Sequence, residues 1–85
     1  MESPIKILIL TTNQVLISQV MEVTAELGEP DCKLIEPFVI ETDDVLSPWM
    51  IGLTNDNQFM ISSDKILSLT EPTPALVKKY KSLLD

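Results

Sequence analysis

Few side chains in this sequence could carry out chemistry, and they do not form any of the common catalytic arrangements. The chain has no His, and its six basic residues are all Lys, so Ser-His-Asp and Cys-His arrangements cannot be built. Cys32 lies in an apolar stretch and is predicted to be a small buried hydrophobe. With only Gly28 and Gly52, no glycine-rich phosphate loop is possible. We therefore predict a protein that is not an enzyme and that uses no cofactor.

Oxygen-bearing side chains cluster at two places where a hard cation could bind. One cluster is Asp43 with Asp44, and the other is Asn55, Asp56 and Asn57. Neither has the ligand spacing of an EF-hand, and such clusters are typical of turns. The sequence therefore predicts turns at both places and no metal site.

The charge of the chain is strongly acidic, with a formal net charge of −7 from six Lys and thirteen Asp and Glu residues. Binding of nucleic acid relies on Lys and Arg side chains that neutralise phosphates. Missing Arg also removes bidentate contacts to phosphate. This charge disfavours RNA as a direct partner and leaves two alternatives, a protein partner or a charge that only keeps the chain soluble.

Length and composition predict a single domain, 1–85, that associates with copies of itself. A chain of 85 residues is near the lower limit for an independent core and buries only about 60% of its unfolded surface. Yet 45% of its residues are hydrophobic and its mean hydropathy is +0.21. Part of this apolar surface is expected to contact another subunit. The alternative is a monomer with scattered exposed Leu and Ile side chains.

The single cysteine cannot form an internal disulfide, which favours a reducing, cytoplasmic location. The apolar run at residues 7–10 is too short for a signal peptide, and no segment has the length needed to span a membrane.

Apolar and β-branched runs predict six strands, at residues 5–12, 15–26, 32–41, 49–54, 58–62 and 65–69. Asn13 and Gln14 are expected to form a hairpin turn. Pro37 has no N–H to donate, so the third strand should carry a bulge or lie at an edge there. Residues 42–48 are expected to form an acidic loop.

The last segment has a helical period and predicts an amphipathic helix over about 74–84. Thr73 is a suitable N-cap, and Pro74 suits the first helical position. One face of this helix would be apolar, with Leu76, Val77, Tyr80, Leu83 and Leu84. The predicted fold is thus mainly β: a small, strongly bent antiparallel open barrel of five strands with room for an extra one, plus a short C-terminal helix.

Residues 4–72 resemble the Sm-like (LSm) family, and more narrowly the small Sm-like proteins encoded by cyanophages. In this chain, the stretch IKILILTTNQVLISQVMEV resembles the opening of the first Sm motif. The stretch MISSDKILSL lies where the second Sm motif would run. The likeness to the phage proteins lies in GEPDCKLIEP and in DKILSLTEP followed by LVKKY.

The resemblance implies a homo-oligomeric ring, in which the fourth strand of the Sm-like fold pairs with the fifth strand of the next subunit. The residues at this subunit interface would be Met60, Ile61, Ser62, Ile66, Leu67, Ser68 and Leu69. For a phage-encoded protein, the implied setting is RNA processing or regulation in the cytoplasm of an infected bacterium.

Two functions remain open for such a ring. Sm-like rings bind single-stranded RNA through two loops, which implies a site at Asp31, Ser62, Ser63, Asp64 and Lys65. The alternative is an acidic adaptor ring that binds proteins and does not contact RNA directly. In the second case Trp49 would anchor the partner, unless it packs in the core.

Overall fold

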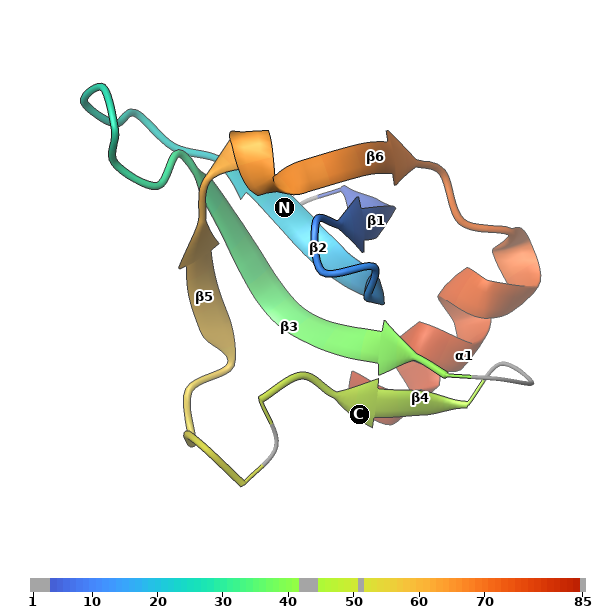
Figure 1. Ribbon diagram of the computed structural model, residues 1–85. Coiled ribbons are helices and arrows are strands. Elements are labelled where there is room, and N and C mark those ends of the chain that lie inside the picture. Colours follow the sequence, from blue (N-terminus) through green and yellow to red (C-terminus); the bar gives the residue numbers. More distant parts are fainter. Residues whose placement is uncertain (1–3, 42–44, 51, 85) are drawn as a thin grey trace.

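Six antiparallel strands and one C-terminal helix make up the fold in the computed structural model, which describes residues 4–41, 45–50 and 52–84 (Figure 1). These strands belong to one sheet that is not closed. In chain order the elements are β1 (Ile5–Leu10), β2 (Val15–Glu22), β3 (Cys32–Ile40), β4 (Leu46–Pro48), β5 (Gln58–Ile61), the 3-10 turn η2 (Ser63–Lys65), β6 (Ile66–Thr70) and α1 (Pro74–Leu84).

The first hairpin forms at the predicted turn. Asn13 has a φ of 70°, in the left-handed region that Asn tolerates better than most residues. Its N–H donates to the carbonyl of Leu10 at 2.8 Å, and the Leu10 N–H donates to the carbonyl of Gln14 at 3.0 Å. These bonds set the register in which Ile9 lies opposite Val15.

The sheet runs in the order β4-β3-β2-β1-β6, and β5 also pairs with β3. β3 therefore has two partners along one edge: residues 32–35 pair with β5, and residues 38–40 pair with β4. β3 curves strongly between these two partners (Figure 1).

A β-bulge interrupts β3 at Pro37, which is one of the two alternatives that the sequence predicts. The register changes from Ile17 opposite Phe38 to Gln19 opposite Ile35, so two residues, 36 and 37, face one residue of β2. The φ of 51° at Glu36 lies in the left-handed region. A bulge bends its strand and increases the local twist, which accounts for the curve of β3.

Two buried hydroxyl groups bind the backbone carbonyls at the bulge. The Tyr80 hydroxyl donates to the Glu36 carbonyl at 2.8 Å and lies 3.2 Å from the Ile35 carbonyl. The Ser18 hydroxyl lies 2.9 Å from the Gln19 carbonyl of its own strand and 3.1 Å from the Ile35 carbonyl. Both side chains are fully buried. Because a buried carbonyl without a partner is costly, these hydroxyls stabilise the bulge.

Apolar side chains cover both faces of the sheet. The core cluster on one face consists of Leu8, Leu10, Leu16 and Leu34, with Val20, Val39, Trp49, Ile61 and Ile66 packed against it. On the other face Ile17 is fully buried opposite Phe38, whose ring meets the Tyr80 ring edge-on with centroids 5.8 Å apart. Helix α1 therefore attaches to the face opposite the main core.

The predicted helix is confirmed with its predicted bounds and cap. The Leu76 N–H donates to the Thr73 hydroxyl at 3.2 Å, which is the N-cap interaction. Tyr80 is buried, Leu76 and Val77 are half-buried, and Leu83 is 46% exposed.

The predicted strand at 49–54 is wrong. The strand is instead β4, which lies inside the segment predicted as an acidic loop, although residues 42–44 of that segment are outside the described residues. Beyond β4 the chain turns: Met50 and Gly52 have φ values of 61° and 80°, and the Leu53 N–H bonds to the Met50 carbonyl at 3.0 Å. The left-handed backbone there is incompatible with a continuing strand.

The first two predicted strands are also too long. β1 ends at Leu10, before the hairpin turn, and β2 ends at Glu22. Only the Val23 N–H, which donates to the Asp31 carbonyl at 3.0 Å, continues the pairing beyond β2. A turn follows at Gly28, with a φ of 90°.

We expect Tyr80→Phe to lower the free energy of unfolding by about 1–3 kcal/mol, because the Glu36 carbonyl at the bulge loses the Tyr80 hydroxyl as its donor. Urea denaturation at fixed protein concentration measures this change. The control is Ser82→Ala, which removes an exposed hydroxyl bond to the Lys79 carbonyl on the same helix. Equal, small effects of the two substitutions would show that the Tyr80 hydroxyl does not stabilise the bulge.

Candidate functional site

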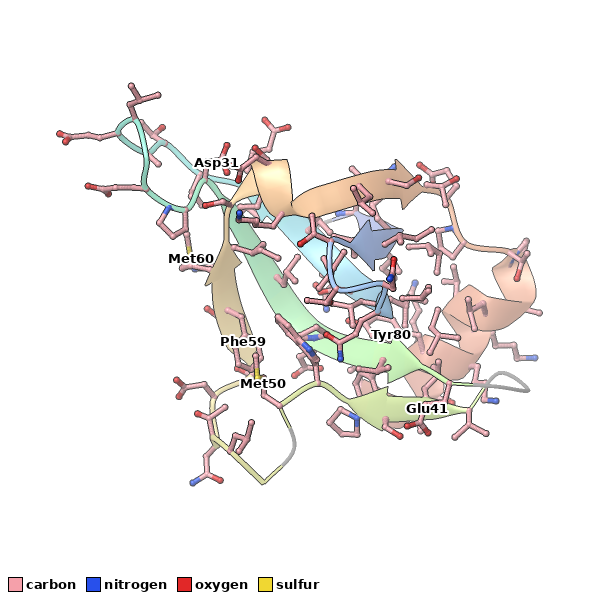
Figure 2. All side chains as sticks on the ribbon, viewed as in Figure 1. Asp31, Glu41, Met50, Phe59, Met60 and Tyr80 are labelled. Atoms are coloured by element: carbon pink, nitrogen blue, oxygen red, sulfur yellow. The ribbon has the colours of Figure 1, made fainter. Side chains whose placement is uncertain are left out.

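The loop before β3 and the turn between β5 and β6 meet at one end of the sheet. Asp31 lies beside η2 (Figure 2). Its Oδ1 accepts the Ser63 N–H at 2.7 Å, and its Oδ2 accepts the Ser63 hydroxyl at 2.8 Å. The structure thus brings together the two loops that the sequence analysis grouped as one site.

Strand register places these loops together. Cys32 at the start of β3 lies opposite Ile61 at the end of β5, so the residues next to them are neighbours. The Lys65 N–H donates to the Ser62 carbonyl at 3.0 Å within η2. The Lys65 carbonyl in turn accepts the Thr11 N–H at 2.9 Å, which ties η2 to the β1–β2 turn.

The Asp31 carboxylate is held in its charged form by Ser63. The Ser63 N–H, and then its hydroxyl, lower the pKa of Asp31 below its ordinary value. A shallow hollow of about 230 Å³ lies here, and the residues that line it are Leu27, Gly28, Glu29, Asp31, Ser62, Ser63 and Asp64. This lining holds carboxylates but no basic or aromatic side chain, whereas single-stranded RNA favours stacking rings and a cationic track.

The predicted interface residues lie on β5, β6 and the turn between them. β5 pairs with β3 by one edge, and β6 pairs with β1 by one edge. No strand in the described part of the chain pairs with their other edges. Three large apolar side chains are exposed on them: Met60 at 49%, Leu67 at 63% and Leu69 at 51%. Ser68 is exposed as well, while Ile61, Ser62 and Ile66 are half-buried.

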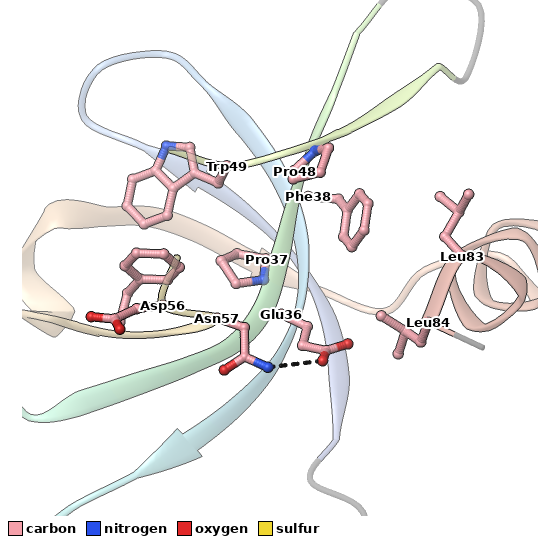
Figure 3. Close-up of a pocket in the computed structure, with 10 residues that line it drawn as sticks. Glu36, Pro37, Phe38, Pro48, Trp49, Asp56, Asn57, Leu83 and Leu84 are labelled. Atoms are coloured by element: carbon pink, nitrogen blue, oxygen red, sulfur yellow. Dashed lines mark hydrogen bonds between the residues drawn. The ribbon is translucent and has the colours of Figure 1, made fainter. Parts of the chain in front are cut away.

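Trp49 lines a groove of about 270 Å³ and also packs against the core (Figure 3). Both roles that the sequence left open for this residue are therefore compatible with its position. Its ring meets Phe59 edge-on, with centroids 5.4 Å apart. The complete lining is Glu36, Pro37, Phe38, Pro48, Trp49, Asp56, Asn57, Phe59, Leu83 and Leu84.

The sequence analysis missed this groove, because its walls come from four separate segments. The available signal was a proline next to an aromatic residue at two places, Pro37 with Phe38 and Pro48 with Trp49. Both pairs line the groove.

The remaining candidate groups are the acidic clusters and Cys32. Within the described residues, no three potential ligands among His, Cys, Asp and Glu gather at one place. Asp43 and Asp44 lie outside those residues. The Asp56 N–H donates to the Thr54 hydroxyl at 3.1 Å, as in a turn. Cys32 is buried as predicted, and burial, followed by the charges of Asp31 and Glu22, raises the pKa of its thiol.

Residues 3–85 match the sequence pattern of DUF6561, a family of unknown function. The chain belongs to the DUF6561 family. Comparison with curated proteins gives no match. The DUF6561 region includes all the strands named above, helix α1, the acidic hollow and the groove. Among the described residues of this DUF6561 chain, no helix combines the length and apolar character needed to cross a bilayer.

We expect Ser63→Ala to raise the pKa of Asp31 part of the way back towards 3.8, because one of its two bonds from Ser63 is lost and the backbone bond remains. NMR titration of the side-chain carboxyl carbon measures this change, with Ser62→Ala as the control. Since the folded-state pKa is lowered, the stability that ionised Asp31 contributes is present at neutral pH and is lost as the pH falls through that lowered value. An unchanged pKa in Ser63→Ala would contradict the assignment.

Proposed function

We propose that this DUF6561 chain is a non-enzymatic Sm-like protein whose subunits assemble into a closed homo-oligomeric ring. The observation that supports this proposal is that β5 and β6, on either side of η2, each have an edge with which no strand of the described residues pairs. Without the three-residue β4, the sheet runs β6-β1-β2-β3-β5, and among the described residues each terminal strand has one edge without a partner strand. Pairing β5 of one subunit with β6 of the next is a head-to-tail contact, which can close into a ring.

The exposed apolar side chains on these edges support the same arrangement. An exposed strand edge with apolar side chains can pair with the strands of other chains and cause aggregation. In a closed ring, each such edge is already paired with the next subunit. Met60, Leu67 and Leu69 would lose exposed surface in this contact, at a gain of roughly 25 cal/mol per Å² of apolar surface buried.

For the ligand of the ring, we propose a protein rather than RNA. The hollow at Asp31 carries carboxylates without a cation, and the whole chain has a net charge of −7. Both features repel a phosphate backbone. An acidic ring of this kind would act as an adaptor for partners with a basic surface.

The ring proposal predicts one discrete oligomer in native mass spectrometry, and dissociation to monomers in Leu67→Glu. Leu67 is 63% exposed in the single chain, so a charge there should affect assembly far more than folding. The matched control is Leu53→Glu, which introduces the same change on a 79% exposed side chain in the loop before β5. A wild-type protein that is monomeric at micromolar concentration would refute the ring.

We also expect no saturable binding of fluorescently labelled oligo(U) or oligo(A) in anisotropy titrations at ~0.15 M salt, because the site lacks the charge that RNA requires. The purified protein should also show no excess of nucleic-acid absorbance over protein absorbance in its ultraviolet spectrum. Binding that falls steeply with salt and weakens in Lys65→Ala would instead establish RNA as the ligand.

A further inference from the structure

The groove beside the bulge is lined mostly by apolar side chains. Pro37, which is buried, lies between two apolar walls (Figure 3). On one side, the Trp49 ring meets the Phe59 ring edge-on. Leu83 and Leu84 of α1 lie on the other side. Grooves lined by aromatic and other apolar side chains bind extended chains that are rich in proline.

The charged groups of the groove are acidic. Among the residues that line it, Glu36 and Asp56 carry carboxylates and none is basic. The Asn57 side-chain amide donates to Oε1 of Glu36 at 3.0 Å, which fixes this carboxylate beside the groove. A Lys or Arg side chain of an occupant would find carboxylate partners here, and an aromatic face for a cation–π contact.

The backbone of Trp49 is fixed beside the bulge, because its N–H donates to the Pro37 carbonyl at 3.0 Å. This bond keeps Trp49 in the lining of the groove.

We propose that this groove binds an extended segment of a partner protein, in which a Lys or Arg lies next to a proline or another apolar residue. The apolar residue would occupy the space between Trp49 and the leucines of α1, and the basic side chain would reach Glu36 or Asp56. Nucleic acid and acidic peptides would be repelled by the same carboxylates. This inference rests on the proposed function, since it names the partner of the adaptor, but the groove forms within one chain and does not require the ring.

The test is selection of peptides from a random display library on the immobilised full-length protein, followed by titration calorimetry with the selected peptides as synthetic probes. The expected peptides are enriched in Lys or Arg adjacent to proline or apolar residues. Their affinity should fall at least tenfold in Asp56→Lys, which reverses a groove charge. The matched control is Glu26→Lys, which changes the net charge equally at an exposed site outside the groove lining and should keep the affinity within about twofold.

Trp49→Ala provides a second variant, with an expected loss of at least tenfold in affinity. Because Trp49 packs against the core, its result counts only if the variant still unfolds cooperatively, and otherwise Asp56→Lys decides. Selection of no peptides, of acidic peptides, or of peptides that bind Asp56→Lys as well as wild type would overturn the proposal. If the protein is monomeric and binds basic peptides, the ring is refuted and the peptide-binding role of the groove is retained. If the protein forms a ring but selects no peptides, only the peptide-binding role is refuted.

Discussion

The β-bulge at residues 36 and 37 is the constraint on which the rest of the fold depends. Ser18 and Tyr80, which are fully buried, place hydroxyls on its carbonyls, and Pro37 has no N–H that would need a partner in the ladder. The bulge bends β3, so that residues on its two sides pair with different strands. Without this bend β3 would be a straight strand with a single neighbour on that edge, and the sheet would not curl around its leucine core.

The same bulge also holds the walls of the groove. The Pro37 carbonyl accepts the Trp49 N–H at 3.0 Å, just after β4, and the Glu36 N–H donates to the Asn57 carbonyl at 2.6 Å, just before β5. One irregular point of β3 therefore fixes both segments between which the groove opens. Tyr80 adds the third side, because its hydroxyl attaches α1 to the same carbonyls. In a regular strand, the Glu36 N–H and the Pro37 carbonyl would pair with a neighbouring strand. At the bulge they instead bind the two segments that line the groove.

Much of the fold could be predicted from local signals. Asn13 and Pro37 act through the conformation or hydrogen bonding of their own backbone, and Thr73 acts through its side-chain hydroxyl, which accepts the Leu76 N–H. The turn, bulge and cap lie where these residues predict them. The strand at 49–54 was misplaced because its apolar residues suit a strand. The left-handed conformations of Met50 and Gly52 belong to the turn through which the chain comes back to pair β5 with β3, and this pairing is not local. Likewise, the contact of Asp31 with Ser63 follows from strand register, and the groove from four segments, which no local pattern encodes.

An acidic chain can still associate through apolar strand edges, because electrostatic repulsion and hydrophobic burial act over different distances. In the proposed ring, repulsion between subunits of charge −7 would be spread over the surface and screened beyond a Debye length of about 8 Å at physiological salt. Burial of Leu67 and Leu69, which are exposed in the single chain, would act at contact and would not be screened. Salt therefore weakens the charge repulsion that opposes assembly more than the apolar burial that favours it. The charge that remains around a ring would attract basic partners over distance, while the apolar walls of the groove would hold them at contact.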